Sequence, residues 1–193
     1  MKYNKEKKEI ILNRKLNKLD KFVLDFIKIL EKYVNYVIIS GYISILLGRS
    51  RATEDIDVFI EQISEKKFSE LYKELRENNF WCLNAEDEKE IFDYLKINTA
   101  VRFSLKKRPI PNFEVKFPKN NLDRETFSDY ITVIMPNGRL KISSLERQIA
   151  FKKYYLKSDK DIEDAIHIEE IFKEQLDYDK INKLKSILIK HGK

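Results

Sequence analysis

The amino-acid sequence predicts an α/β (α+β) fold, in which a small mixed sheet flanked by helices is followed by a helical C-terminal subdomain. Up to about residue 142, short β-branched runs alternate with stretches whose apolar residues recur at helical spacing. From there to the end, the apolar spacing is helical throughout. We therefore expect residues 1–142 to form the core, with a helical segment at its N-terminus, and residues 143–193 to form the helical subdomain.

The core is expected to begin with an amphipathic helix or helix pair at 5–33, because apolar side chains recur there every three or four residues. Further helices are expected at 42–48, 64–78 and 86–97. Strands are expected at 35–40, 55–61, 99–105, 112–117, 131–135 and 139–142, with the segment KKRPIP as a turn. In the subdomain we expect helices at 144–157, 159–175 and 178–191. The first two begin at capping-box spacings, Ser143 with Glu146 and Ser158 with Asp161.

Composition narrows the class of protein. The chain has 193 residues, of which 42% are hydrophobic and only four each are Gly and Pro, which argues against disorder and low complexity. Cys82 is the single cysteine, so an intrachain disulfide is excluded and a reducing, cytoplasmic setting is favoured. No apolar run reaches membrane-spanning length, and we expect no membrane partner. A net charge of +6 suits an anionic partner such as a nucleotide or RNA, and equally a solvated lysine-rich surface.

The stretch from residue 36 to residue 61 carries the main chemical signal. Asp55 and Asp57 lie two residues apart on an expected strand, so their side chains share one face. Two convergent carboxylates repel each other unless a cation lies between them, and a hard divalent cation is the usual one. Upstream, Ser40 and Gly41 link a strand to a short helix, whose free backbone N–H groups can bind an anion. An ordinary strand-to-helix turn is the alternative for Gly41.

This arrangement resembles the nucleotidyltransferase superfamily of the DNA polymerase beta type, whose members have a Gly-Gly or Gly-Ser turn, a short helix and an Asp-x-Asp strand. Its spacing, with Arg51-x-Thr53 before the acids, resembles the branch of AbiEii-like nucleotidyltransferase toxins. Ser40 stands where the first glycine of the turn is usual. The C-terminal half adds to the resemblance, because Lys152 is followed by the segment Lys160-Asp161-Ile162-Glu163-Asp164.

The resemblance implies transfer of a nucleoside monophosphate from a nucleoside triphosphate to a tRNA or other RNA end, a protein or a small-molecule hydroxyl. It further implies a toxin–antitoxin component with a cognate antitoxin protein as partner, and Mg²⁺ or Mn²⁺ as cofactor. A catalytically inactive, nucleotide- or RNA-binding regulatory module of the same fold is the alternative. The implied roles are metal binding by Asp55, Asp57 and Glu114, phosphate binding by Ser40 and Gly41, charge neutralisation by Arg51 and Lys152, bracing of the turn or phosphate binding by Thr53, and orientation of Lys152 by Asp161.

Three of these assignments have alternatives. Glu114 is either a third carboxylate or the partner of Lys116 in a solvent-side pair on an edge strand. Lys152 lies on an apolar helical stripe, so its ammonium needs an anion or must extend into water. Asp161 has the spacing of a capping residue after Ser158. One turn later, Asp164 is expected nearer the surface.

Overall fold

A computed structural model of the protein describes residues 1–191 and has the expected mixed α+β architecture. Within these residues the strands are β1 (Lys2–Asn4), β2 (Glu9–Ile11), β3 (Tyr36–Ile39), β4 (Asp55–Ile60), β5 (Phe80–Cys82), β6 (Val101–Leu105), β7 (Arg108–Lys116), β8 (Tyr130–Met135) and β9 (Gly138–Ser143). The helices are α1 (Lys18–Leu30), α2 (Gly41–Leu46), α3 (Glu65–Glu77), α4 (Glu88–Lys96), α5 (Asn121–Arg124), α6 (Leu145–Phe151), α7 (Asp159–Phe172) and α8 (Tyr178–His191).

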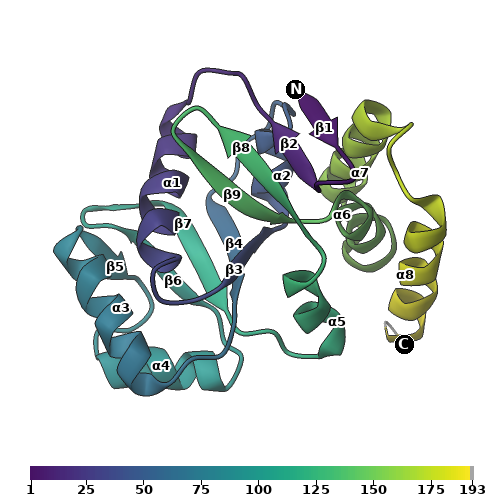
Figure 1. Ribbon diagram of the computed structural model, residues 1–193. Coiled ribbons are helices and arrows are strands. Elements are labelled where there is room, and N and C mark those ends of the chain that lie inside the picture. Colours follow the sequence, from purple (N-terminus) through teal and green to yellow (C-terminus); the bar gives the residue numbers. More distant parts are fainter. Residues whose placement is uncertain (192–193) are drawn as a thin grey trace.

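The described strands form one mixed sheet of nine, in the order β1-β2-β8-β9-β3-β4-β7-β6-β5. β4 therefore lies inside the sheet, antiparallel to β3 on one side and parallel to β7 on the other. Figure 1 shows α6, α7 and α8 gathered beyond one side of the sheet, away from α3 and α4. None of the helices within residues 1–191 combines the length and the apolar character that a membrane crossing requires.

Aromatic side chains hold α1 against the sheet. Phe26 stacks on Phe113 of β7 with 3.9 Å between ring centroids, and it packs edge-on against Phe80 of β5. Phe113 is completely buried, so its neighbours Asn112 and Glu114 point to the opposite face. The same core cluster continues into α6 and α7 through residues such as Leu145 and Ile168. One face of β7 is therefore core, and the other carries polar side chains.

The expectation of a helix over residues 5–33 is wrong for its first half. Ile10 and Ile11 lie in β2, which pairs with β8 in parallel, because a β-branched pair beside an unfilled sheet edge packs better as a strand. The helix begins only at Lys18, where Asn17 and Asp20 form a capping box. Asp20 is fully buried, and its carboxylate accepts hydrogen bonds from Arg14.

Other boundaries also differ from expectation. The turn after β6 is confined to Lys106 and Lys107, because β7 continues back to Arg108 and pairs with Leu105. Ser144, rather than Ser143, caps α6 by accepting a hydrogen bond from the backbone N–H of Arg147. The expected helix 144–157 changes to a π-helix at Lys152–Leu156. The cap at Ser158 is found as expected, since its hydroxyl accepts from the N–H of Asp161.

Candidate active site

Asp55 and Asp57 lie on one face of β4, as their alternation implies. Both are half-buried, whereas Ile56 and Val58 between and after them are completely buried on the other face. In the parallel pairing with β7, Asp57 lies directly opposite Glu114. Because directly paired residues project from the same face of a sheet, three carboxylates come from adjacent positions of two neighbouring strands.

Two basic side chains neutralise part of this acidic group. The Lys116 ammonium donates to Asp57 Oδ1 over 2.8 Å, and the Arg102 guanidinium donates through Nε to Glu114 Oε1, also over 2.8 Å. β7 lies between β4 and β6, so the alternative of an edge-strand pair between Glu114 and Lys116 is wrong. Each of these two residues instead pairs with a side chain from a neighbouring strand.

The donor set of the two β4 acids fits a hard divalent cation. Asp55 and Asp57 offer carboxylate oxygens from one face of a strand, and these are the donors that Mg²⁺ takes in proteins. Within residues 1–191, however, no group of three or more His, Cys, Asp or Glu side chains is arranged to hold a metal ion. The carboxylate of Glu114 is bound by Arg102 from the neighbouring strand β6.

The turn before α2 has a backbone conformation that favours glycine. Ser40 has φ 68° and ψ −143°, a region that residues with a Cβ rarely occupy. Its side chain makes no capping hydrogen bond to α2. The turn therefore has a backbone conformation that suits glycine although a serine stands there, and the strained backbone has a cost in stability.

We expect the S40G variant to be more stable than the natural protein by about 1 kcal/mol, because glycine removes the strain at positive φ and gives back part of the gain through its more flexible unfolded chain. Denaturant unfolding monitored by circular dichroism measures the change. The matched control is S40A, which also lacks the hydroxyl but keeps the Cβ, and it should show no gain. Equal stability of the two variants would contradict the assignment of strain to Ser40.

Gly41 is covered by a side chain rather than open to solvent. A Cβ at this position would lie 3.2 Å from Arg51 Nη2 and 3.3 Å from Arg51 Nη1. The planar guanidinium therefore packs on the backbone of the turn. The absence of a side chain at Gly41 allows this close approach of Arg51.

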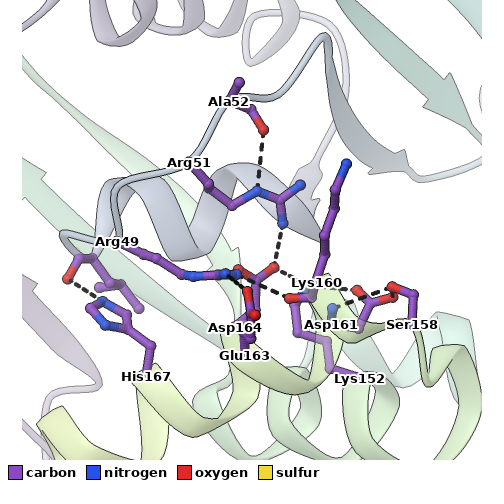
Figure 2. Close-up of polar contacts among 11 residues, drawn as sticks. Arg49, Arg51, Ala52, Lys152, Ser158, Lys160, Asp161, Glu163, Asp164 and His167 are labelled. Atoms are coloured by element: carbon purple, nitrogen blue, oxygen red, sulfur yellow. Dashed lines mark hydrogen bonds and ion pairs between the residues drawn. The ribbon is translucent and has the colours of Figure 1, made fainter.

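Asp164 on α7 is the centre of a buried ion cluster that joins the loop before β4 to the C-terminal helices. Its carboxylate accepts from Arg49 and Arg51 of the loop and from Lys152, whose Nζ lies 2.8 Å from Oδ2. Figure 2 shows the two arginines reaching from the loop toward the acidic face of α7. Arg49 also donates to the exposed carboxylate of Glu163 and to the carbonyl of Lys160.

Lys152 finds its anion inside the protein. Its side chain is 1% exposed, and it also donates to Asp161 Oδ1 over 3.1 Å. The alternative that its ammonium extends into water is therefore wrong, and so is the expectation that Asp164, which is 0% exposed, lies near the surface. Burial by itself would raise the pKa of Asp164, but the hydrogen bonds and charges of Lys152, Arg49 and Arg51 outweigh it and lower the pKa below its usual value.

A cleft of 330 Å³ opens between the sheet and α6. Of the residues expected in the site, Ser40, Asp57 and Lys152 line it. Thr53 braces the start of β4 by donating to the carbonyl of Asp55 over 3.0 Å. The remaining lining is four basic or amide side chains, three further polar ones and an apolar wall: Lys116, Lys119, Arg147, Gln148, Asp123, Thr126, Ser143, Ile39, Phe59, Phe151, Tyr155 and Leu156.

Several of these residues were not identified from the sequence. Lys116 carried a signal, because it lies two residues after Glu114 and so shares its face, but its partner Asp57 depends on the pairing of β4 with β7. Arg147 carried none, since a helical arginine is ordinary on a surface, and here it is 4% exposed. Asp164, which does not line the cleft, was expected near the surface and not as a partner of Lys152.

Comparison with known proteins establishes the fold. No protein-family model matches the sequence, and no curated protein matches it. Among solved structures, an antigenic nucleotidyltransferase-like protein from Paracoccidioides brasiliensis is 18% identical, with a TM-score of 0.53 over 89% of this chain and 86% of its own. The antibiotic-resistance factor ANT(2'')-Ia is 12% identical, with a TM-score of 0.53 over 89% of this chain and 91% of its own.

A third similar structure is the lincosamide antibiotic adenylyltransferase LnuA with lincomycin bound. It is 13% identical and has a TM-score of 0.53 over 82% of this chain and 99% of its own. Since the identities are low, these likenesses concern the fold. The protein has the fold of nucleotidyltransferases.

Proposed function

We propose that the protein is a metal-dependent nucleotidyltransferase that transfers a nucleoside monophosphate from a nucleoside triphosphate to an acceptor. The observation that carries the proposal is the cleft in which Ser40, Asp57 and Lys152, widely separated in the sequence, face one space. Four basic and two acidic side chains line it, so the cleft suits a polyanion. Its apolar wall offers Phe151 and Tyr155 for contact with a base or sugar.

In the reaction, an acceptor oxygen forms a bond to the α-phosphorus, the bond from that phosphorus to the bridging β-oxygen breaks, and pyrophosphate leaves. Asp55 and Asp57 would hold Mg²⁺ or Mn²⁺, with Glu114 as the proposed third carboxylate. When bound, such an ion supplies positive charge that stabilises the transferring phosphoryl group. Asp57, half-buried in the cleft wall, would also accept the proton of the acceptor hydroxyl.

The basic residues around α2 would bind the phosphates. The guanidinium of Arg51 lies over Gly41, so a β- or γ-phosphate at this turn would meet the guanidinium as well as the hydroxyl of Ser40. Lys152 would stabilise charge on the departing pyrophosphate. Asp161 and Asp164 would hold Lys152 in place, since both accept from its ammonium.

The acceptor and the partner are further parts of the proposal. The Arg51-x-Thr53 and Lys152 motifs support membership of the AbiEii-like branch, and with it an RNA or tRNA acceptor, a role in a toxin–antitoxin pair and a cognate antitoxin protein. Exposed Lys5, Lys7 and Lys8 in the turn between β1 and β2 favour a polyanionic acceptor. Small-molecule acceptors are part of the test because ANT(2'')-Ia is an antibiotic-resistance factor, and protein acceptors are part of it because the AbiEii-like resemblance implies them.

A specific observation favours one alternative, a catalytically inactive module that binds nucleotide or RNA. Lys116 and Arg102 occupy oxygens of Asp57 and Glu114 that a metal site would need. In such a module these ion pairs would be permanent. Binding of nucleotide would then occur without any transfer.

A screen with nucleoside triphosphates labelled at the α-phosphate tests the proposal. Each of the four nucleotides is incubated with the protein, Mg²⁺ and either total tRNA, lysate protein or small-molecule acceptors. We expect label to enter one class of acceptor, and EDTA to abolish its transfer. Nucleotides labelled at the γ-phosphate are the control, because nucleotidyl transfer releases that label with pyrophosphate. Nucleotide binding with no transfer to any acceptor would select the inactive module.

A further inference from the structure

Lys116 occupies an unusual position for a lysine, because its ammonium binds an acid of the proposed metal site. Its Nζ lies 2.8 Å from Asp57 Oδ1. The two side chains are 23% and 17% exposed, so the pair belongs to the wall of the cleft and not to the open surface. A charge pair in such a position is screened less by water and salt than an exposed one.

The strand register makes this contact a built-in feature of the fold. β4 and β7 run parallel, with Asp57 opposite Glu114 and Phe59 opposite Lys116. Lys116 therefore contacts Asp57, which lies two residues before its own partner Phe59 and on the same face of β4. Its ammonium also lies 5.8 Å from the centre of the Phe59 ring, which defines the path of the side chain. Among residues 1–191, no other acid forms a salt bridge with Lys116.

The contact between Lys116 and Asp57 opposes the binding of a metal ion. An oxygen that accepts a short hydrogen bond from an ammonium has less electron density to offer a divalent cation, and the ammonium repels that cation. Asp57 cannot serve both partners at the same oxygen. We infer that Lys116 competes with the divalent cation for Asp57 and that its ammonium moves from Asp57 to the phosphates when the nucleotide binds; this rests on the proposed nucleotidyl transfer.

The cleft provides the destination for the displaced lysine. Lys116 lines it together with Ser40 and Lys152, which are the residues proposed to meet the phosphates. A lysine has a flexible stem and a compact charge, so it can exchange one anion for another without movement of the backbone. Metal and nucleotide would then bind cooperatively. Each ligand would be weak alone, because the metal alone must displace Lys116 and the nucleotide alone must draw Lys116 away from Asp57.

The test measures binding, without relying on turnover. Mn²⁺ is titrated into the nucleotide-free protein, and free Mn²⁺ is followed by electron paramagnetic resonance. In K116M we expect Mn²⁺ to bind roughly tenfold more tightly than in the natural protein, because a like charge beside Asp57 is removed. ATP in the presence of EDTA, followed by calorimetry, should bind roughly tenfold more weakly to K116M, because a phosphate ligand is lost. These opposite shifts are not expected from a residue that only supports the fold.

Two variants provide controls. K119M removes another lysine of the same cleft whose ammonium makes no salt bridge within residues 1–191, and its Mn²⁺ affinity should equal that of the natural protein. K116R retains the charge and should retain the weak Mn²⁺ binding. Thermal unfolding of each variant checks that the fold is intact.

The outcomes separate the inference from the proposed function. If K116M and the natural protein bind Mn²⁺ equally while both bind ATP with Mn²⁺, the competition is overturned and the proposed function stands. If neither protein binds Mn²⁺ or ATP under any condition, both are overturned. Tighter Mn²⁺ binding and weaker ATP binding in K116M support the inference.

Discussion

The D55N variant should transfer nucleoside monophosphate at least about 10³-fold more slowly than the natural protein, because a neutral amide offers the metal no charge and metal stabilisation of a phosphoryl transition state amounts to several kcal/mol. Label transfer under the conditions found in the screen measures the loss. Thermal unfolding should be almost unchanged, since Asp55 is half-buried and takes part in no salt bridge within the described residues.

The matched control for D55N is D25N, which makes the same chemical change on the exposed face of α1. Its transfer rate should equal that of the natural protein. A folded D55N variant that transferred label at the natural rate would rule out a metal site at Asp55 and Asp57. Loss of activity in both variants would point to a general effect of charge and contradict the specific role.

The D164N variant should be less stable by about 3 kcal/mol, because it removes the charge of a fully buried acid and leaves Arg49, Arg51 and Lys152 without their common partner. For a chain of this length, a loss of that size lowers the midpoint of thermal unfolding by roughly 10 °C. The neighbouring E163Q variant is the control. Glu163 also binds Arg49, but its side chain is 62% exposed, so its loss should cost less than about 1 kcal/mol.

The difference in stability between D164N and the natural protein depends on pH, because the pKa of Asp164 is lowered in the folded state. The ionised carboxylate is stabilised in the folded protein, so the folded state binds fewer protons than the unfolded chain. Between the folded pKa and the unfolded pKa of Asp164, the free energy of unfolding therefore rises with pH. The contribution is complete above the unfolded pKa of about 4 and is lost as the pH falls through the folded pKa. Unfolding by urea at pH 7 and at pH 3 should show the gap between D164N and the natural protein shrinking at the lower pH. A gap that widened in acid would contradict the assignment.

The elements that carry the site were predictable because their patterns are local. The first four residues of the run DIDVFI alternate polar and apolar side chains in β4, and Ser64 caps α3 by accepting from the N–H of Lys67. The prediction of a helix from residue 5 was wrong because the structure there depends on a distant element. Its apolar spacing fits a helix, but β2 exists because β8, more than a hundred residues later, offers an edge to Ile10 and Ile11.

Within the site, the sequence showed which side chains are in unusual positions more reliably than it showed which residues they bind. Lys152 on an apolar stripe had to find an anion, and it did, but that anion is Asp164 in this structure. The contact of Lys152, in the π-helix after α6, with Asp164 on α7 also involves Arg49 and Arg51, so it depends on tertiary packing and has no local signature. The same limit hid the pairing of Lys116 with Asp57, since strand order cannot be read from either strand alone.

The location of β4 has a kinetic consequence. Hydrogen-bonded strands flank it on both sides, so its backbone cannot shift without breaking two ladders, whereas the Lys116 side chain that binds its Asp57 is long and partly exposed. Rearrangement of charge in the cleft is then a matter of rotamer changes, which take picoseconds to nanoseconds for exposed side chains. Exchange of Lys116 between Asp57 and a ligand would equilibrate far faster than any catalytic turnover. Loading of the site should show no slow conformational phase.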